Sequence, residues 1–113
     1  MVLHVFSTGS LAATADVVTL DQVADGQTAV VIGVALDLDG RPVVAPWRTG
    51  TRARYQVVLA TDAIRTGASA LGDVSTVPVT IVLDRAGRPF ARVPRQLRDG
   101  ELDALVARAA TSK

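Results

Sequence analysis

The chain has 113 residues, of which 49% are hydrophobic and 20% charged, with one histidine, no cysteine and a net charge of +1. This length and composition predict a single soluble domain over residues 1–113, because the chain is too apolar for intrinsic disorder and has no apolar run of the ~18–20 residues that span a membrane. The absence of cysteine excludes disulfides, thiolate metal sites and thiol redox chemistry, and with His4 as the sole imidazole we expect neither a metal nor a cofactor.

The first third of the chain predicts a β-α-β unit. Residues 2–6 form a short β-prone run that is typical of a buried strand. Ser10 fits the N-cap of a helix that ends near Gly26, with apolar side chains along one face. Residues 29–36 are almost wholly apolar, as in a strand that is covered on both faces. A right-handed connection would make these two strands parallel.

The middle of the chain predicts a mainly helical connection. Residues 43–53 favour a short helix, in which Pro46 is tolerable only in the first turn. Residues 56–60 form a brief extended run. Asp62 is expected to cap a further helix over residues 63–71.

The last third predicts a β-hairpin and a closing helix. Residues 79–83 and 89–93 are two strands separated by a tight turn, so we expect them to pair antiparallel. Asp99 is expected to cap a final helix whose apolar stripe faces the core. The order of elements is therefore β-α-β, a helical connection, then β-β-α.

Charge is distributed unevenly along the chain. Residues 1–40 contain five acids and no Lys or Arg, whereas residues 41–113 hold all twelve basic residues. The arginines concentrate in residues 41–54 and 85–98, but the lysines and stacking aromatics that nucleic-acid surfaces usually add are scarce there. We interpret the arginines as a solvated face and do not expect a nucleic-acid partner. An arginine-rich module that binds another kind of partner remains the alternative.

Three segments, taken in their order along the chain, carry a family resemblance. Residues 5–10 (Val-Phe-Ser-Thr-Gly-Ser) stand before the first helix, and residues 76–80 (Thr-Val-Pro-Val-Thr) enter a strand that is followed by residues 84–87 (Asp-Arg-Ala-Gly). This arrangement resembles the thioredoxin superfamily, especially its TlpA/ResA-like extracytoplasmic branch, over residues 2–110. The resemblance implies an α/β, three-layer sandwich with a mixed four-stranded sheet and helices on both faces. It also suggests an extracytoplasmic location.

The redox centre of that family is missing from this chain. The family's Cys-any-any-Cys pair falls on Ser10, Leu11, Ala12 and Ala13, and Gly9 stands where a Trp usually precedes the first Cys. Dithiol exchange needs a thiolate that attacks sulfur and a second thiol that closes the disulfide, so the activity is not carried over. Loss of the Trp and of the intervening Pro favours natural degeneration. Replacement of the cysteines by engineering is the alternative.

Pro78 is the other landmark of the resemblance. In the family this proline is cis and borders the active-site loop, which implies that Val77 and Pro78 lie beside Ser10 and form a shallow apolar groove. The alternative is that Pro78 only shapes the turn. For Ser10 itself we expect an N-cap role, because His4, the one candidate base, lies inside a predicted strand.

The preferred functional hypothesis is a redox-inactive thioredoxin-like domain with a protein-binding or scaffold role. Its contact surface would be the former active-site face, and its partner a protein or peptide. The alternative is a thiol-disulfide oxidoreductase whose cysteines were replaced.

A second expectation concerns the edge of the sheet. Relatives of this branch usually cover the strand equivalent to residues 29–36 with an additional strand. Because this strand is apolar and uncharged, we expect an edge here that pairs with a second copy, giving a homodimer, or that upstream sequence of the natural protein covers.

Overall fold

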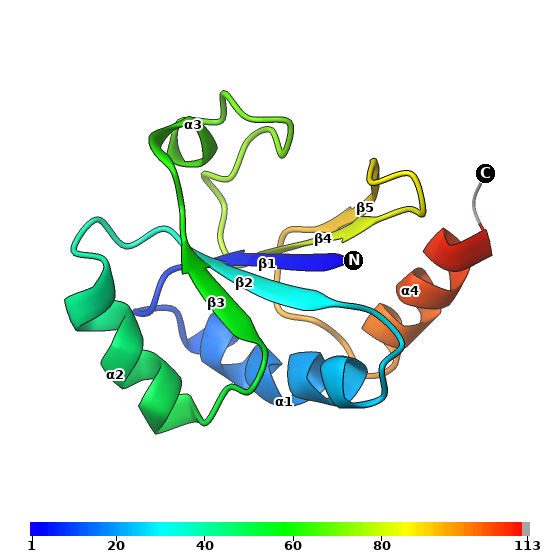
Figure 1. Ribbon diagram of the computed structural model, residues 1–113, viewed down its shortest axis with the longest axis horizontal. Coiled ribbons are helices and arrows are strands. Elements are labelled where there is room, and N and C mark those ends of the chain that lie inside the picture. The colour runs from blue at the N-terminus through cyan, green and yellow to red at the C-terminus, as the bar shows by residue number, and fades with distance from the viewer. Residues whose placement is uncertain (112–113) are drawn as a thin grey trace.

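The computed structural model describes residues 1–111, whose strands form one mixed sheet in the order β3-β2-β1-β4-β5 (Figure 1). The β1–β2 and β2–β3 pairs are parallel, and the β1–β4 and β4–β5 pairs are antiparallel. In chain order the elements are β1 (Val2–Phe6), α1 (Leu11–Asp25), β2 (Val31–Ala35), α2 (Arg41–Thr51), β3 (Gln56–Leu59), α3 (Asp62–Arg65), β4 (Val79–Leu83), β5 (Pro89–Val93) and α4 (Glu101–Thr111).

The predicted β-α-β unit is present at the N-terminal end of the chain. Strands β1 and β2 pair in parallel with Val2 opposite Val31. Helix α1 begins directly after Ser10, whose Oγ accepts a hydrogen bond from the Ala13 N–H at 3.2 Å. This bond satisfies one of the N–H groups that every helix leaves unpaired in its first turn, so the sequence-based N-cap is confirmed.

The predicted sheet of four strands is wrong, because the sheet has five. The extended run that follows α2 is strand β3, which pairs in parallel with β2. A second right-handed crossover through α2 continues in the direction of the first and places β3 beyond β2. Residues 29–36 therefore lie inside the sheet rather than at its edge, and the expected dimer through them is also wrong. The free edge on this side belongs to β3 (Figure 1).

The two middle helices differ from their predicted bounds. Helix α2 begins at Arg41, with Pro42 in its first turn, and it accommodates Pro46 in its interior. Pro46 has no N–H to donate to the carbonyl of Pro42, four residues earlier. Helix α3 is a single turn capped by Thr61, whose Oγ1 accepts the Ile64 N–H, rather than by Asp62.

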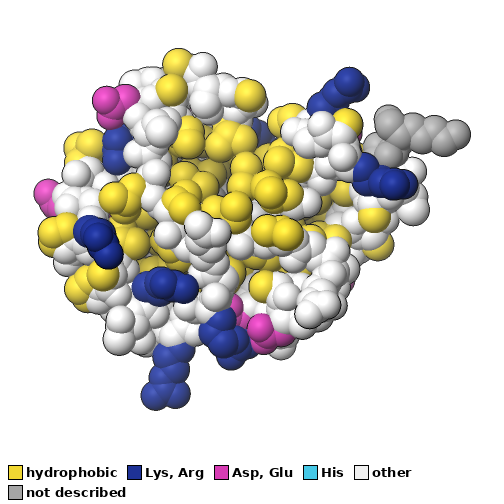
Figure 2. All heavy atoms as spheres, in the orientation of Figure 1, with side chains coloured by type: hydrophobic (Ala, Val, Ile, Leu, Met, Phe, Trp, Pro, Cys, Tyr) yellow, Lys and Arg dark blue, Asp and Glu magenta, His cyan; other side chains and the backbone are white. Residues whose placement is uncertain are grey.

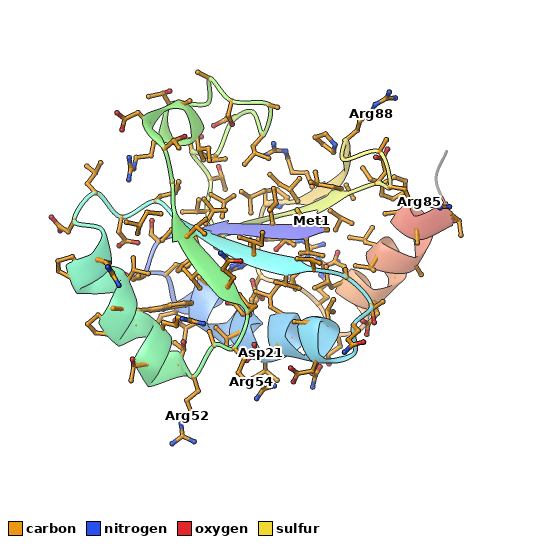
Figure 3. The ribbon with its side chains drawn as sticks, in the orientation of Figure 1. Met1, Asp21, Arg52, Arg54, Arg85 and Arg88 are labelled. Atoms are coloured by element: carbon orange, nitrogen blue, oxygen red, sulfur yellow. The ribbon has the colours of Figure 1, made fainter. Side chains whose placement is uncertain are left out.

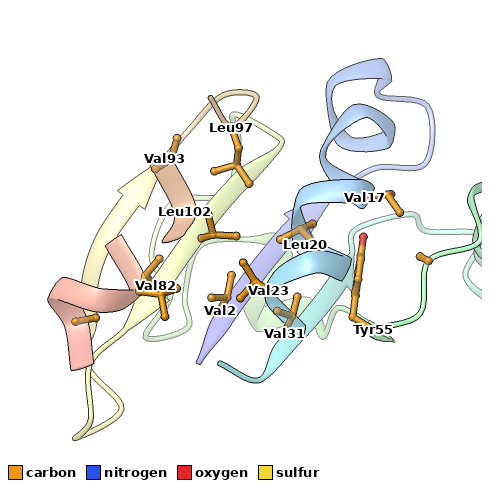
Figure 4. Packing of buried hydrophobic residues seen from close by; sticks show 13 residues of the cluster. Val2, Val17, Leu20, Val23, Val31, Tyr55, Val82, Val93, Leu97 and Leu102 are labelled. Carbon is orange, nitrogen blue, oxygen red and sulfur yellow. The ribbon is translucent and has the colours of Figure 1, made fainter. Parts of the chain in front are cut away.

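The helices are unevenly shared between the two faces of the sheet. Helices α1, α2 and α4 cover one face, while the other carries the short α3 and the segment leading to β4 (Figure 1). The expected second helical layer is thus reduced to one turn. The larger core lies beneath α1 and α4 (Figure 4) and includes Val2, Val17, Leu20, Val23, Val31, Tyr55, Val82, Val93, Leu97 and Leu102.

The α3 face has a smaller apolar cluster built on Val5, Val34 and Ile81. Leu3 and Ile32 pack against it but are only partly buried. Figure 2 shows hydrophobic side chains gathered across the middle of the view, over the strands and between the α3 segment and the β4–β5 hairpin.

An ion pair ties the start of α4 to the segment before it and should make stability depend on acid. Glu101 accepts hydrogen bonds from the Arg95 guanidinium at 2.8 and 2.6 Å and from the Arg98 N–H at 3.0 Å. The bonds from Arg95 and Arg98 lower the pKa of Glu101 to about 2. A depressed carboxyl pKa adds stability that is present above the unfolded value and is lost as pH falls toward the folded value.

We therefore expect the wild-type advantage over Glu101→Gln, on the order of 1 kcal/mol for a partly exposed pair, to vanish between about pH 5 and pH 2. Urea denaturation across this pH range measures it. Asp103→Asn, in the same helical turn, is the matched control and should change little. If the free energies of unfolding of wild type and Glu101→Gln changed in parallel with pH, this would contradict the contribution assigned to Glu101.

Candidate functional site

The loop between β1 and α1 is held by the loop that follows β2. The Ser10 N–H donates to the Ser7 carbonyl at 3.0 Å and closes a tight turn. Thr8 donates twice to the Asp37 carboxylate, through its N–H at 3.1 Å and through its hydroxyl at 2.7 Å. Hydrogen bonds to an ionised carboxylate are about twice as strong as neutral ones, so the two loops form one rigid unit.

The register of the sheet brings Pro78 to the same end of the molecule. Val5 lies opposite Val79 across the β1–β4 pair, so the residue before Val79 lies beside the end of β1 from which the Ser10 loop departs. The Val77–Pro78 peptide bond is cis. Pro78 is buried and Val77 partly buried, so neither offers a wide exposed surface.

The exposed apolar surface at this end comes from other residues. Leu11, at the start of α1, is 88% exposed, and Leu38, in the loop after β2, is 85% exposed. A Cβ added to Gly9 would meet nothing within 4 Å. Ala12 is partly buried and Ala13 fully buried, since Ala13 packs inward beneath the helix. Gly9 and Leu11 are therefore the predicted site residues most open to a partner, and sequence reasoning missed Leu38.

Nothing in this arrangement activates Ser10 as a nucleophile. Its Oγ is engaged with the Ala13 N–H, and the His4 ring is fully buried with its Nε2 3.1 Å from Asp16 Oδ2. A nucleophilic serine needs a base within hydrogen-bond reach, and His4 instead contacts Asp16. The structure supports the N-cap role.

A buried polar layer that sequence reasoning missed lies between α1 and the sheet. Besides His4, Asp16 accepts the Leu97 N–H at 3.0 Å. One turn further along α1, Asp21 accepts the N–H groups of Arg54 at 2.9 Å and Tyr55 at 3.3 Å (Figure 3). The two acids thereby fix α1 to the strand and loops around it. Both acids adjoin the apolar stripe of α1, but a place beside that stripe does not by itself show that an acid is buried.

Replacing Tyr55 with phenylalanine should make the protein more stable. Within residues 1–111 its hydroxyl is buried without a hydrogen-bond partner, and burial, with a further contribution from Asp21 and Asp16, raises the pKa of Tyr55 well above its usual value. A buried, unpaired hydroxyl costs free energy that its removal recovers. We expect Tyr55→Phe to raise the free energy of unfolding by about 1 kcal/mol, measured by urea denaturation. Tyr55→Ala, which also removes the ring, should lower it by about 3–5 kcal/mol, and a loss in Tyr55→Phe would contradict the prediction.

Within residues 1–111 no three acidic or histidine side chains come together as a metal site. In the same part of the chain, no helix combines the length and apolarity needed to cross a bilayer.

No family model matches the chain, and neither does any curated protein. Solved structures do match over nearly its whole length. One is a thiol:disulfide interchange protein of the thioredoxin family from Chlorobium tepidum, with a TM-score of 0.77 and 18% identity over 96% of this chain and 77% of that one. The chain has a thioredoxin-like fold.

Two other thioredoxin-like structures are similar to the same extent. A secreted Mycobacterium tuberculosis disulfide oxidoreductase, homologous to E. coli DsbE, gives a TM-score of 0.76 and 19% identity over 95% of this chain and 79% of that one. A secreted thiol-disulfide isomerase from Corynebacterium glutamicum gives a TM-score of 0.78 and 19% identity over 98% of this chain and 70% of that one. The resemblance is thus confirmed as to fold, in a thioredoxin-like chain that contains no cysteine.

Proposed function

We propose that this thioredoxin-like domain is redox-inactive and binds another protein through the face that surrounds Ser10. Dithiol exchange requires sulfur, and these 113 residues contain no cysteine. The loops of that face nevertheless keep a defined geometry, since Thr8 and Asp37 hold them together. A preorganised surface binds with a smaller loss of conformational entropy than a mobile one.

The observation that carries the proposal is the exposure of Leu11 and Leu38 on these two joined loops. A partner that covers exposed apolar side chains releases water from them, and this burial stabilises the complex. Leu11 opens α1 next to the N-cap, and Leu38 directly follows Asp37, so both belong to the rigid unit.

Site-specific photo-crosslinking in the protein's native host tests the proposal. A photo-reactive residue is placed at Leu11, at Leu38, or at Val18, which is 65% exposed on α1 but lies about two turns from the loops. We expect the same discrete protein adduct from Leu11 and Leu38 and none from Val18. Leu11→Asp should weaken the adduct formed from Leu38. Identical products from all three positions, or none from the first two, would overturn the proposal.

The second candidate is a thiol-disulfide oxidoreductase whose cysteines were replaced, favoured because the matched structures are those of thiol-disulfide interchange proteins, oxidoreductases and isomerases. The variant Ser10→Cys/Ala13→Cys, assayed for insulin disulfide reduction, separates the two. Under the proposed function it stays near the rate of the single Ser10→Cys control. A large rise over that control would favour the oxidoreductase.

We also propose an extracytoplasmic location. Two of the matched proteins are described as secreted. Cell fractionation of the native host tests this, and recovery of the protein in the cytoplasm alone would contradict it.

A further inference from the structure

Strand β3 presents unpaired backbone groups at the edge of the sheet. The Ala60 N–H donates to the Ala35 carbonyl of β2 at 2.9 Å. Backbone groups point alternately to the two sides of a strand, so those of Val57 and Leu59 point away from β2. In the part of the chain that the structure describes, β3 has no neighbour on that side. Two N–H and two C=O groups are therefore available to an added strand.

A groove with a positive rim runs along this edge. It encloses about 340 Å³ between β3 and α2 and is lined by Arg41, Val44, Ala45, Arg48, Val57 and Leu59. The spacing of Arg41, Ala45 and Arg48 places them on one face of α2. No acidic residue lines the groove, and in residues 1–111 neither Arg41 nor Arg48 is in an ion pair.

The charge of this groove decides between possible occupants. Pairing of β3 with β3 of a second copy would bring two sets of Arg41 and Arg48 together, and like charges placed opposite each other destabilise an added strand. Carboxylates of a different chain would instead form charge-assisted, bidentate hydrogen bonds with the guanidinium groups. The apolar floor formed by Val57 and Leu59 would bury the aliphatic part of such side chains.

We propose that the β3 edge binds an extended acidic segment of a partner protein by strand addition, with acidic side chains at alternate positions facing Arg41 and Arg48. Main-chain hydrogen bonds to Val57 and Leu59 supply affinity, and the arginines select the sequence. This surface lies between β3 and α2 and has its own lining residues, and the inference does not depend on the proposed function.

Fluorescence anisotropy with a labelled, end-blocked peptide, Val-Glu-Val-Glu-Val-Glu-Val, tests the inference. We expect binding that the variant Arg41→Glu/Arg48→Glu weakens at least about tenfold. The matched control is Arg85→Glu/Arg88→Glu, which makes the same charge change at the β4–β5 turn on the opposite side of the molecule (Figure 3) and should bind within about twofold of wild type. Equal weakening by both variants, or no binding by wild type, overturns the proposal.

Two further measurements test the mode of binding. In an extended peptide the N–H groups of the Glu residues point to one side and those of the Val residues to the other. N-methylation of one set should abolish binding, and N-methylation of the other should preserve it; equal effects of the two sets would rule out strand addition. Sedimentation velocity of the free protein should show a monomer, and a dimer that the peptide cannot dissociate would overturn the choice of occupant.

Discussion

Replacing Asp16 with leucine is expected to lower the free energy of unfolding by about 2–6 kcal/mol, because it leaves two buried hydrogen-bonding groups unpaired at about 1–3 kcal/mol each. Asp16 is 1% exposed and His4 fully buried, with Nε2 and Oδ2 3.1 Å apart. The substitution leaves the His4 ring and the Leu97 N–H without their acceptor in a site that water does not reach. Chemical denaturation of wild type and variant measures the difference.

Two controls separate this loss from a general effect of changing α1. Asp16→Asn keeps an acceptor for the Leu97 N–H, so its free energy of unfolding should fall much less than that of Asp16→Leu. Asp25→Ala removes the exposed ion pair between Asp25 and Arg54 on the same helix and should change stability by less than about 1 kcal/mol. A loss in Asp16→Leu no larger than that in Asp25→Ala would show that the buried pair contributes little.

Gly33→Val should cost about 1–3 kcal/mol, the usual effect of overfilling a packed core. Gly33 lies in the middle of β2, where a Cβ would come within 3.1 Å of Tyr55 Cε2, 3.2 Å of Phe6 Cε1 and 3.3 Å of Val57 Cγ2. Valine suits a strand better than glycine, but that gain is smaller than the steric cost of moving two rings. Thermal unfolding should show a lower Tm.

Gly50→Ala provides a control of opposite sign. Gly50 lies in α2 and a Cβ there would meet nothing within 4 Å. Alanine in a helix is favoured over glycine by about 1 kcal/mol, so Tm should rise. A Gly33→Val variant as stable as wild type would mean that the rings of Phe6 and Tyr55 move aside freely.

The two ends of the chain were predictable because their side chains follow the periodicities of regular structure. The run of residues 2–6, the Ser10 cap and the hairpin over residues 79–93 each carry a local signal that tertiary contacts reinforce. Strand β3 carries a weak signal by comparison. It has four residues, begins with an exposed Gln56 and gains its partner only through the geometry of the α2 crossover.

The polar layer beneath α1 could not be predicted for a different reason. On a helix, Asp16 and Asp21 look like ordinary solvated acids, and their burial depends on what packs against that helix. Their partners Leu97 and Arg54 lie 81 and 33 residues away in sequence, and no local sequence pattern predicts such contacts. The candidate site was predicted from the Ser10 N-cap and the loop order, but the Thr8–Asp37 hydrogen bonds, which join the loop before α1 to the loop that holds Leu38, are also remote in sequence.

The central place of β1 has a consequence for how this protein is made. During synthesis β1 emerges from the ribosome long before its neighbour β4, which begins at Val79, and long before Leu97, whose N–H donates to Asp16. Until these segments have emerged, the nascent chain exposes one edge of its central strand and leaves the Asp16 carboxylate without this donor. The sheet and the buried polar layer around Asp16 therefore close only after Leu97 has been synthesised.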